Sequence, residues 1–229
     1  MNTPLALSVV IPTLDAAASL PATLASLAAG AGAFGYEIIV VDGGSSDATV
    51  AIGAAAGRVT VAPRGRGTQL AAGAALARGE WFLFLHADTR LGGGWGEEVR
   101  RFIADPDHRT RWAAFRFALD DASPAARRLE RMVAWRNRAL GLPYGDQGLL
   151  VHRTAYARAG GFRPLPLMED VDLVRRLGTA RLVGLETPAT TSAARYRRAG
   201  YLRRSARNLV CLGLYFLGVP PRILARFYR

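Results

Sequence analysis

Acidic side chains and one histidine stand directly after three of the apolar runs that the sequence predicts as strands. They are Asp15 after the first run, Asp42 after the second, and His86 and Asp88 after the fourth. In an open α/β sheet, ligands bind beyond the carboxyl ends of the strands, so these residues are expected to meet at one edge. Carboxylate oxygens suit a divalent cation. The pattern therefore predicts a site for a cation, a nucleotide or both.

Each of these residues also has a purely structural explanation. Aspartate is a favoured helix-capping and turn residue, so Asp15 can belong to a helix start and Asp42, before Gly43 and Gly44, to a turn. His86 and Asp88 can form a solvated strand end. The convergence of the set, more than any one member, favours a ligand site.

The loop from Pro63 to Gly67 carries Arg64 and Arg66 between glycines. Glycine lets the backbone approach a ligand closely. The planar guanidinium fork fits a phosphate or the edge of a nucleobase. The alternative is a basic turn exposed to solvent.

A third feature is the stretch LPLMEDVDL, which opens a helix with Glu169, Asp170 and Asp172. A carboxylate close to an acceptor hydroxyl can take its proton during attack, and a neighbouring carboxylate can raise its pKa. The alternative is structural, because acidic residues at a helix N-terminus are stabilised by the helix dipole.

The elements that must position these residues alternate in the first half of the chain. Strands are expected over 7–12, 37–41, 58–62 and 81–85, with a helix after each of the first three, the second capped by Ser46. Such alternation implies βαβ units and a largely parallel sheet. The second half is less regular: helices are expected over 97–103, 123–140, 154–161 and 168–178, and strands over 111–121, 148–153 and 181–186.

Composition sets further bounds. The chain has 229 residues, half of them hydrophobic, which is enough for one domain with a substantial core. Cys211 is the single cysteine, which excludes a disulfide framework and a cysteine-rich zinc site and fits a reducing compartment. The first basic residue is Arg58, so no secretory signal is expected.

The charge is concentrated at the C-terminus. All 30 basic residues are arginines, the net charge is +12, and nine arginines follow the last acidic residue, Glu186. Such a tail suits an anionic partner. Its apolar run over 208–219 is shorter than the roughly 20 residues that span a bilayer, which indicates a buried or interfacial helix.

Taken together, these motifs resemble the family-2 glycosyltransferases, which bind nucleotide sugars with the GT-A fold. The resemblance covers roughly residues 7–185 and is carried by SVVIPTLD, EIIVVDGGSSDAT, the segment ending in LFLHADT, GDQGLL and LPLMEDVDL. The LHAD and GDQG spellings are similar to a bacterial subgroup of small soluble enzymes often named for arsenosugar biosynthesis. The resemblance implies an α/β GT-A domain over 1–189, with a mostly parallel central sheet, and a basic, amphipathic helical extension over 190–229.

The resemblance also implies roles. Asp88 would bind Mg²⁺ or Mn²⁺ bridging the diphosphate, and Asp170 would deprotonate the acceptor, which gives inversion at the anomeric carbon. The nucleotide would be held by Pro12, Thr13, Asp15, Asp42, Arg64 and Arg66. The donor sugar or acceptor would contact His86, Gly145, Asp146, Gln147 and Glu169.

Two features depart from the family pattern. His86 stands where the first aspartate of the DXD motif is usual; imidazole suits manganese better than magnesium, and it can instead hydrogen-bond ribose or phosphate. A basic-aromatic motif that helps hold the diphosphate in many relatives has no clear copy, although the stretch from Arg195 to Arg198 can do similar work.

The sequence thus predicts an inverting, metal-dependent glycosyltransferase acting on a lipid-linked or small-molecule acceptor. A nucleotidyltransferase is discounted because the chain has no lysine for a phosphate loop, and a dehalogenase-like phosphatase because no DxDxT follows the first strand. The alternative from another class is a non-catalytic membrane-surface or nucleotide-binding protein. We expect a cytoplasmic protein without nucleic-acid partners, whose residues 195–229 contact the inner face of the membrane, a second subunit or its own domain.

Overall fold

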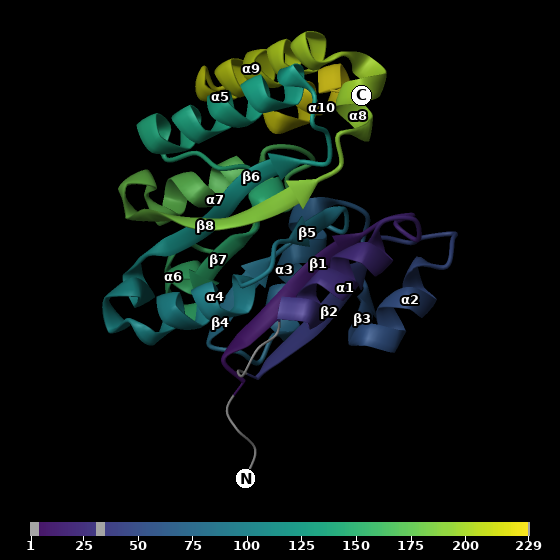
Figure 1. The fold of residues 1–229 in the computed structure, drawn as a ribbon, viewed down its shortest axis with the longest axis vertical. Coiled ribbons are helices and arrows are strands. Elements are labelled where there is room, and N and C mark those ends of the chain that lie inside the picture. The colour runs from purple at the N-terminus through teal and green to yellow at the C-terminus, as the bar shows by residue number, and fades with distance from the viewer. Residues whose placement is uncertain (1–4, 31–34, 229) are drawn as a thin grey trace.

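A twisted sheet runs through the molecule and carries helices on both faces (Figure 1). The structure is a computed structural model that describes residues 5–30 and 35–228. Within these residues the sheet has eight strands in the order β3-β2-β1-β4-β7-β6-β8-β5. The strands are β1 (Leu7–Thr13), β2 (Tyr36–Asp42), β3 (Arg58–Val61), β4 (Trp81–Phe84), β5 (Thr89–Leu91), β6 (Trp112–Leu119), β7 (Leu149–His152) and β8 (Leu182–Thr191).

The first four strands are parallel to one another, as expected from their alternation with helices. Strand β1 pairs with β2 and β4, and β2 with β3, all in parallel, and β6 pairs with β8 in the same way. Strand β7 is antiparallel to both β4 and β6, and β5 to β8. The largely parallel sheet is therefore confirmed, with the antiparallel pairs confined to its second half.

Ten α-helices lie within the described ranges. They are α1 (Leu20–Gly30), α2 (Thr49–Ala56), α3 (Arg66–Leu76), α4 (Trp95–Ala104), α5 (Pro124–Leu140), α6 (Arg153–Arg158), α7 (Glu169–Leu177), α8 (Ala194–Ala199), α9 (Tyr201–Phe216) and α10 (Pro221–Tyr228). Helix α5 begins as its sequence predicts, because the Ser123 hydroxyl accepts from the Ala126 N–H and Pro124 fills the first turn. Gly141 ends it in the left-handed conformation.

The prediction that Ser46 caps the second helix is wrong. Helix α2 begins at Thr49, and the Asp47 carboxylate accepts from the Thr49 N–H at 2.9 Å. The Ser46 hydroxyl instead donates to Asp15 across the gap between the first two strand ends. The serine is therefore part of the loop network beside the candidate site.

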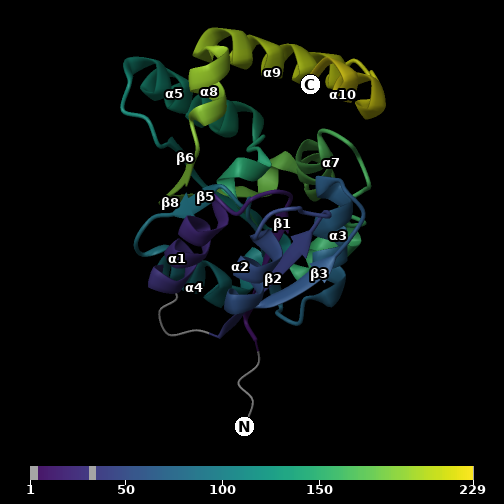
Figure 2. The same ribbon diagram turned by 90° about the vertical axis from the view of Figure 1, so that its right-hand side faces the viewer.

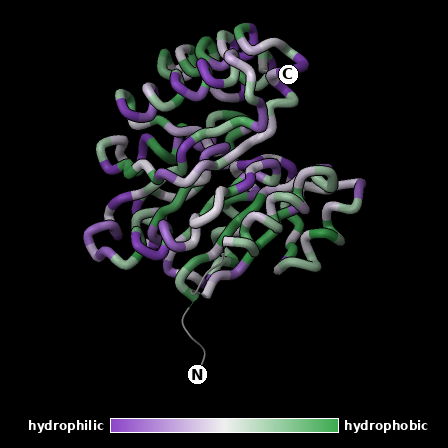
Figure 3. The backbone as a smooth tube through the Cα atoms, in the orientation of Figure 1, coloured by the Kyte–Doolittle hydropathy of each residue, from purple (hydrophilic) through white to green (hydrophobic). Residues whose placement is uncertain are grey.

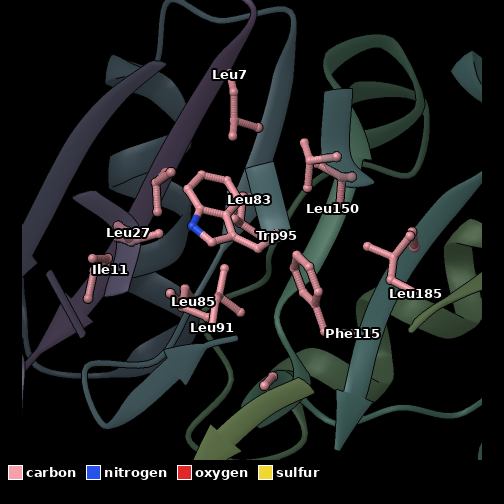
Figure 4. Packing of buried hydrophobic residues seen from close by; sticks show 14 of the residues in the cluster. Leu7, Ile11, Leu27, Leu83, Leu85, Leu91, Trp95, Phe115, Leu150 and Leu185 are labelled. Carbon is pink, nitrogen blue, oxygen red and sulfur yellow. The ribbon is translucent and has the colours of Figure 1, made fainter. Parts of the chain in front are cut away.

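The two largest apolar clusters of the core lie on opposite faces of the sheet. Alternate residues of β1 point to opposite sides, so Leu7 contributes to the cluster under α1 and α4 while Val10 contributes to the cluster under α3. Figure 4 shows the first cluster, in which Leu83, Trp95 and Leu150 come from β4, α4 and β7. These clusters fix the strands whose carboxyl ends carry the polar residues.

Removing the Trp95 side chain should be among the most costly core truncations. Trp95 is fully buried, and its Nε1–H donates to the Ser26 carbonyl at 3.1 Å. We expect Trp95→Ala to lower the free energy of unfolding by about 3–5 kcal/mol in urea titration. Trp135→Ala is the matched control, because Trp135 is 65% exposed and its loss should cost less than about 1 kcal/mol. Equal losses in the two variants would contradict this assignment of the core.

Helices α8, α9 and α10 stack on the second half of the domain (Figures 1 and 2). Cys211, Leu212 and Leu224 pack with Leu167 and Val171 near the start of α7. Figure 3 shows hydrophilic and hydrophobic residues alternating along these helices. No helix in the described part of the chain is both long and apolar enough to span a membrane. The tail is therefore helical, as predicted, and packed on the domain.

Candidate active site

Two adjoining clefts lie beyond the carboxyl ends of the parallel strands. The outer cleft is lined by residues after β1, by the loop before α3 and by the end of β4, including Pro12, Thr13, Asp15, Arg64, Arg66, His86 and Asp88. The second cleft, called the inner cleft, lies against α7, α8 and α9 and has an empty volume of about 840 Å³ with its open mouth included. It is lined in part by Tyr144, Asp146, Met168, Asp170, Ser192, Tyr196, Arg204 and Asn208.

The two clefts form one continuous site. They share four lining residues: Arg66, His86, Asp88 and Arg195. The structure thus brings together Asp15, Asp88 and Asp170, which lie far apart in the sequence. The shared residues include a carboxylate and two guanidinium groups, so the junction offers ligands for a cation and for phosphate oxygens.

Asp42 lies beneath the outer cleft instead of lining it. Its side chain is buried and accepts hydrogen bonds from the N–H groups of Gly44 and Ser45 and from the hydroxyls of Thr13 and Ser45. Burial opposes ionisation, but these donors outweigh it and hold the pKa of Asp42 below its ordinary value. The carboxylate therefore organises the turn after β2 and fixes Thr13 beside the cleft.

Asp15 has a backbone conformation that is rare for a residue with a side chain. Its φ is +47°, in the left-handed region, and its carboxylate accepts from the Ser46 N–H at 2.8 Å. Its own N–H donates to the Ser45 hydroxyl. Met168, in the wall of the inner cleft, is the other non-glycine residue with positive φ among those described. Such strained positions cluster at functional sites because the surrounding contacts must maintain them.

Gln69 is a positioning residue that the sequence did not reveal. Its buried amide donates to the carbonyls of Thr13 at 2.7 Å and Val41 at 2.8 Å. It therefore ties α3 to the ends of β1 and β2. An apolar residue at this position would remove one hydrogen bond from each carbonyl and leave the Thr13 carbonyl to the Gly43 N–H alone and the Val41 carbonyl to the Thr13 hydroxyl.

Glu169 orients an arginine of the junction. Its side chain is 3% exposed, and Oε1 lies 3.0 Å from Nε of Arg66. Burial raises the pKa of Glu169, while the Arg66 guanidinium opposes that rise. The pair leaves Arg66 partly exposed in the clefts, so Glu169 acts on the site through Arg66 and lies behind it.

Asp170 is held between a backbone amide and the start of its own helix. Oδ2 accepts from the Gly145 N–H at 2.7 Å, and Oδ1 accepts from the Val171 N–H at 2.8 Å. A Cβ atom at Gly145 would lie 2.8 Å from Nε2 of His86 and 3.4 Å from Oδ2 of Asp170. Glycine is therefore required for this close approach, which places Asp170, Gly145 and His86 side by side.

His86 is neutral at physiological pH. Its burial, together with the positive charges of Arg66 and Arg195, lowers the pKa of His86 to about 3. A neutral imidazole can ligate a metal or donate and accept hydrogen bonds, whereas an imidazolium cannot ligate.

The residues present fit a divalent cation that is coordinated partly by the protein and partly by the phosphate oxygens of a bound molecule. Asp88 supplies a carboxylate and His86 a neutral imidazole at the junction. No group of three or more possible metal-binding side chains occurs in the part of the chain that the structure describes. Magnesium and manganese sites that hold phosphates need only one or two protein carboxylates, so this donor set is compatible with them.

Asp146 faces the inner cleft at the short 3₁₀ turn Gly145–Gln147. Burial raises the pKa of Asp146 to about 6; Asp170 and Asp88 add to the rise, and the Arg136 guanidinium opposes it. Oδ1 is buried and has no hydrogen-bond partner among the described residues. The ionised form of Asp146 is therefore less favourable in the folded protein than in the unfolded chain.

Replacing Asp146 by asparagine should stabilise the protein at neutral pH. Because the pKa is raised on folding, the wild-type carboxyl contributes its full stability below about pH 4 and loses it as the pH rises through about 6. We expect Asp146→Asn to raise the free energy of unfolding at pH 7.5 by no more than about 3 kcal/mol, and the melting temperature with it, and to have little effect at pH 4. Thermal melts in chelator without nucleotide measure this. A difference that does not change with pH would show that Asp146 is not the titrating group.

Some predicted site residues lie outside the clefts, and some residues that line the clefts could not be predicted from the sequence. Gln147 is fully buried and accepts a hydrogen bond from Asn137 on α5, so it supports the turn from behind. Of the stretch from Arg195 to Arg198, Arg195 and Tyr196 line the inner cleft, whereas Arg197 pairs with Asp120 and Asp121. Tyr144, Arg204 and Asn208 were missed, because only the packing of α5 and α9 brings them to the site.

The comparison with protein families decides the class of the chain. Residues 8–162, more than half of the chain, match the model described as glycosyl transferase family 2. The chain belongs to glycosyl transferase family 2. A search of curated proteins finds no match.

Solved structures agree on the fold of this family-2 chain. TarS 1–349 from S. aureus with UDP-GlcNAc has 17% identity and a TM-score of 0.65, covering 90% of this chain and 66% of that one. The mannosyltransferase PcManGT from Pyrobaculum calidifontis with GDP-Man and Mn²⁺ has 18% identity and a TM-score of 0.63, covering 88% and 59%. Glucosyl-3-phosphoglycerate synthase from Mycobacterium tuberculosis, with Mn²⁺, UDP and glucosyl-3-phosphoglycerate, has 18% identity and a TM-score of 0.54, covering 82% and 70%.

This family-2 chain spans only part of some of these proteins. It covers 39% of the longer TarS structure and 64% of the TarS 1–349 structure. At such identities the likeness concerns the fold, which agrees with the GT-A domain expected from the sequence.

Proposed function

We propose that the chain is an inverting, divalent-metal-dependent glycosyltransferase that moves a sugar from a nucleoside diphosphate to an acceptor hydroxyl. The continuous cleft carries this proposal: arginines and Asp88 lie at its junction, and Asp170 lies in its inner part. The family match and the nucleotide-sugar complexes of the similar structures support it.

In this proposal the outer cleft holds the nucleoside and the junction holds the diphosphate. Pro12, Thr13 and Asp15 form one wall, and Arg64 lies on the other. Arg66, oriented by Glu169, and Arg195 from α8 present guanidinium groups where the diphosphate would lie. Guanidinium groups bind phosphate oxygens and stabilise the negative charge that the departing diphosphate develops.

Asp88, with neutral His86 beside it, is the group that would hold Mn²⁺ or Mg²⁺. A bound cation would neutralise part of the charge on the leaving diphosphate. The Mn²⁺ in the PcManGT complex and in the mycobacterial synthase complex supports this role. Imidazole as a second ligand favours manganese over magnesium.

Asp170 is the proposed general base. Each carboxylate oxygen accepts one backbone N–H, and a carboxylate has about four lone-pair sites, so it can still accept the proton of an acceptor hydroxyl. Attack by that hydroxyl from the side opposite the diphosphate inverts the anomeric carbon. Asp146 and Gly145, on the same side of the inner cleft, would bound the donor sugar or the acceptor.

The proposed C-terminal extension, residues 190–229, contributes to the site as well. Strand β8 ends at Thr191, and Arg195, Arg204 and Asn208 beyond the division contribute to the inner cleft. The acceptor would thus meet a surface built partly by residues 190–229.

The experiment that tests the proposed function measures the release of nucleoside diphosphate from UDP- and GDP-sugars with Mn²⁺ and candidate acceptors. We expect one donor to be turned over, and the product to have the opposite anomeric configuration by NMR. Binding of these nucleotides without turnover of any of them would favour the non-catalytic alternative. Retention of configuration would refute the assignment of Asp170 as a base acting in a single displacement.

A further inference from the structure

Helix α9 presents an apolar face to solvent. Exposed positions recur along it at intervals of three and four residues, which places them on one side of the helix. The large apolar residues on or directly after this side are Leu202, Leu209, Val210, Phe216 and Leu217, of which Leu202 is 88% and Leu217 83% exposed. A surface helix of a globular domain ordinarily buries its apolar stripe and exposes the polar one.

Helix α10, which packs beside α9, also exposes apolar residues. Ile223 and Phe227 are exposed and lie one helical turn apart, and Arg222 and Arg226 accompany them with the same spacing. We call the seven exposed apolar residues of this region the outer apolar face: Leu202, Leu209, Val210, Phe216, Leu217, Ile223 and Phe227.

Most of the outer apolar face lies away from the domain, although Leu209 borders a cavity against α5 and the Phe216 ring is covered on one side by the Arg175 guanidinium of α7. The opposite side of α9 supplies Cys211 and Leu212 to a buried cluster and places Arg204 and Asn208 in the inner cleft. Leu224 on α10 is fully buried in the same cluster. The helices therefore pack against the domain mainly with one side and leave an extended apolar area exposed on the other. Such an exposed area marks an interaction surface.

The charge around this surface selects the partner. No acidic residue follows Glu186, and Arg198, Arg203, Arg222 and Arg226 are exposed. In a symmetric dimer each residue near the axis meets the same patch of the second copy, so arginines would approach arginines. An anionic lipid surface instead offers both an apolar layer and negative charge.

We propose that the outer apolar face of α9 and α10 docks on a membrane surface that contains anionic lipid. The apolar side chains enter the boundary between headgroups and acyl chains, and the flanking arginines contact the lipid phosphates. Helix α9 has 16 residues, fewer than the roughly 20 that span a bilayer, so it lies in the plane of the membrane.

Docking has a consequence for the acceptor, which rests on the proposed function. An α-helix with its side chains is about 10–12 Å across, so the Arg204 and Asn208 side of α9 would lie about that far from the lipid. A hydroxyl carried by a lipid-linked molecule is then presented close to the inner cleft. The lipid-linked acceptor is therefore favoured over the soluble one.

Vesicle flotation tests the docking directly and needs no substrate. We expect the wild type to float with vesicles of phosphatidylcholine and phosphatidylglycerol, more weakly at high salt, and weakly or not at all with phosphatidylcholine alone.

The double variant Val210→Glu/Leu217→Glu should abolish flotation. Arg222→Gln/Arg226→Gln should reduce partitioning about 25-fold, since each arginine near an anionic surface contributes about fivefold. Val50→Glu, at an exposed apolar residue of α2, is the matched control and should float like the wild type.

Two results would overturn the proposal. One is flotation of Val210→Glu/Leu217→Glu equal to that of the wild type. The other is a wild type that is dimeric by sedimentation and does not float, with the same double variant monomeric, which would assign the face to a second copy. The shift in melting temperature caused by UDP with Mn²⁺ is measured in every variant, so a failure of the nucleotide site is recognised separately from a failure of docking.

Discussion

Asp88→Ala is expected to lose the metal-dependent part of nucleotide binding. Asp88 is the carboxylate at the junction of the two clefts, and the other potential ligand there, His86, is neutral. Without this carboxylate, the residues shared by the two clefts include no acidic side chain. We expect calorimetry to show that, with Mn²⁺ present, the variant binds UDP or GDP about 100-fold more weakly than the wild type does. In chelator, the variant and the wild type should bind the nucleotide with the same low affinity.

Asp107→Ala serves as the control for this variant. Asp107 is exposed in the turn after α4 and lines neither cleft, so its removal should leave the effect of Mn²⁺ on nucleotide affinity intact. If the wild type binds nucleotide equally well with and without Mn²⁺, or if Asp88→Ala keeps the full effect of the metal, Asp88 is not the metal ligand.

Asp170→Asn is expected to stop sugar transfer while the donor still binds. The amide has nearly the shape of the carboxylate but cannot take a proton from the acceptor. General-base catalysis contributes about 10²–10⁴-fold, so kcat should fall by that factor while the dissociation constant of the donor changes by less than about twofold. Single-turnover kinetics with the donor identified by nucleotide release, together with calorimetry, separate the two quantities.

Asp172→Asn is the matched control, because it removes a carboxylate two positions further along the same helix. Asp172 pairs with Arg163 and Arg176, on the opposite side from Gly145, so it should affect stability more than kcat. A thermal melt establishes that both variants are folded. A transfer rate of Asp170→Asn within tenfold of the wild type would assign the base to another group. Asp146 would then be the next candidate, because it also lines the inner cleft.

The arrangement of the first half could be predicted from the sequence because local patterns determine it. The apolar runs ending at Pro12, Val41 and Leu85 form largely buried strands, and the helical crossovers between them make the strands parallel. Parallel strands end at one edge, so Asp15 and Asp88 had to approach each other.

The details of side-chain contact could not be predicted in the same way. Asp42 and Gln147 have the residue types of a binding site but are buried, where they bond to the turn after β2 and to Asn137. Whether such a residue faces a ligand or supports the loop behind it depends on the rotation of the loop backbone. Sequence spacing does not encode that rotation.

The contribution of the C-terminal helices was the least predictable part. Their arginines and apolar residues indicate an amphipathic helix, but not which side faces the domain. In the structure the polar Arg204 and Asn208 face inward to the cleft while Val210 and Leu217 face outward. This orientation follows from the contacts of Cys211 and Leu212 with α7, which are separated from it by more than 30 positions in the sequence.

Thermal shift with a panel of nucleotide sugars, with Mn²⁺ or with chelator, tests the central claim most directly. A donor at about 100 times its dissociation constant stabilises the folded state by about 2.7 kcal/mol, which for a chain of this size raises the melting temperature by roughly 5–11 °C. We predict such a rise for one donor with Mn²⁺, a much smaller one in chelator, and the small value for Asp88→Ala under both conditions. The absence of a shift with every donor, or an equal shift with and without metal, would contradict the account.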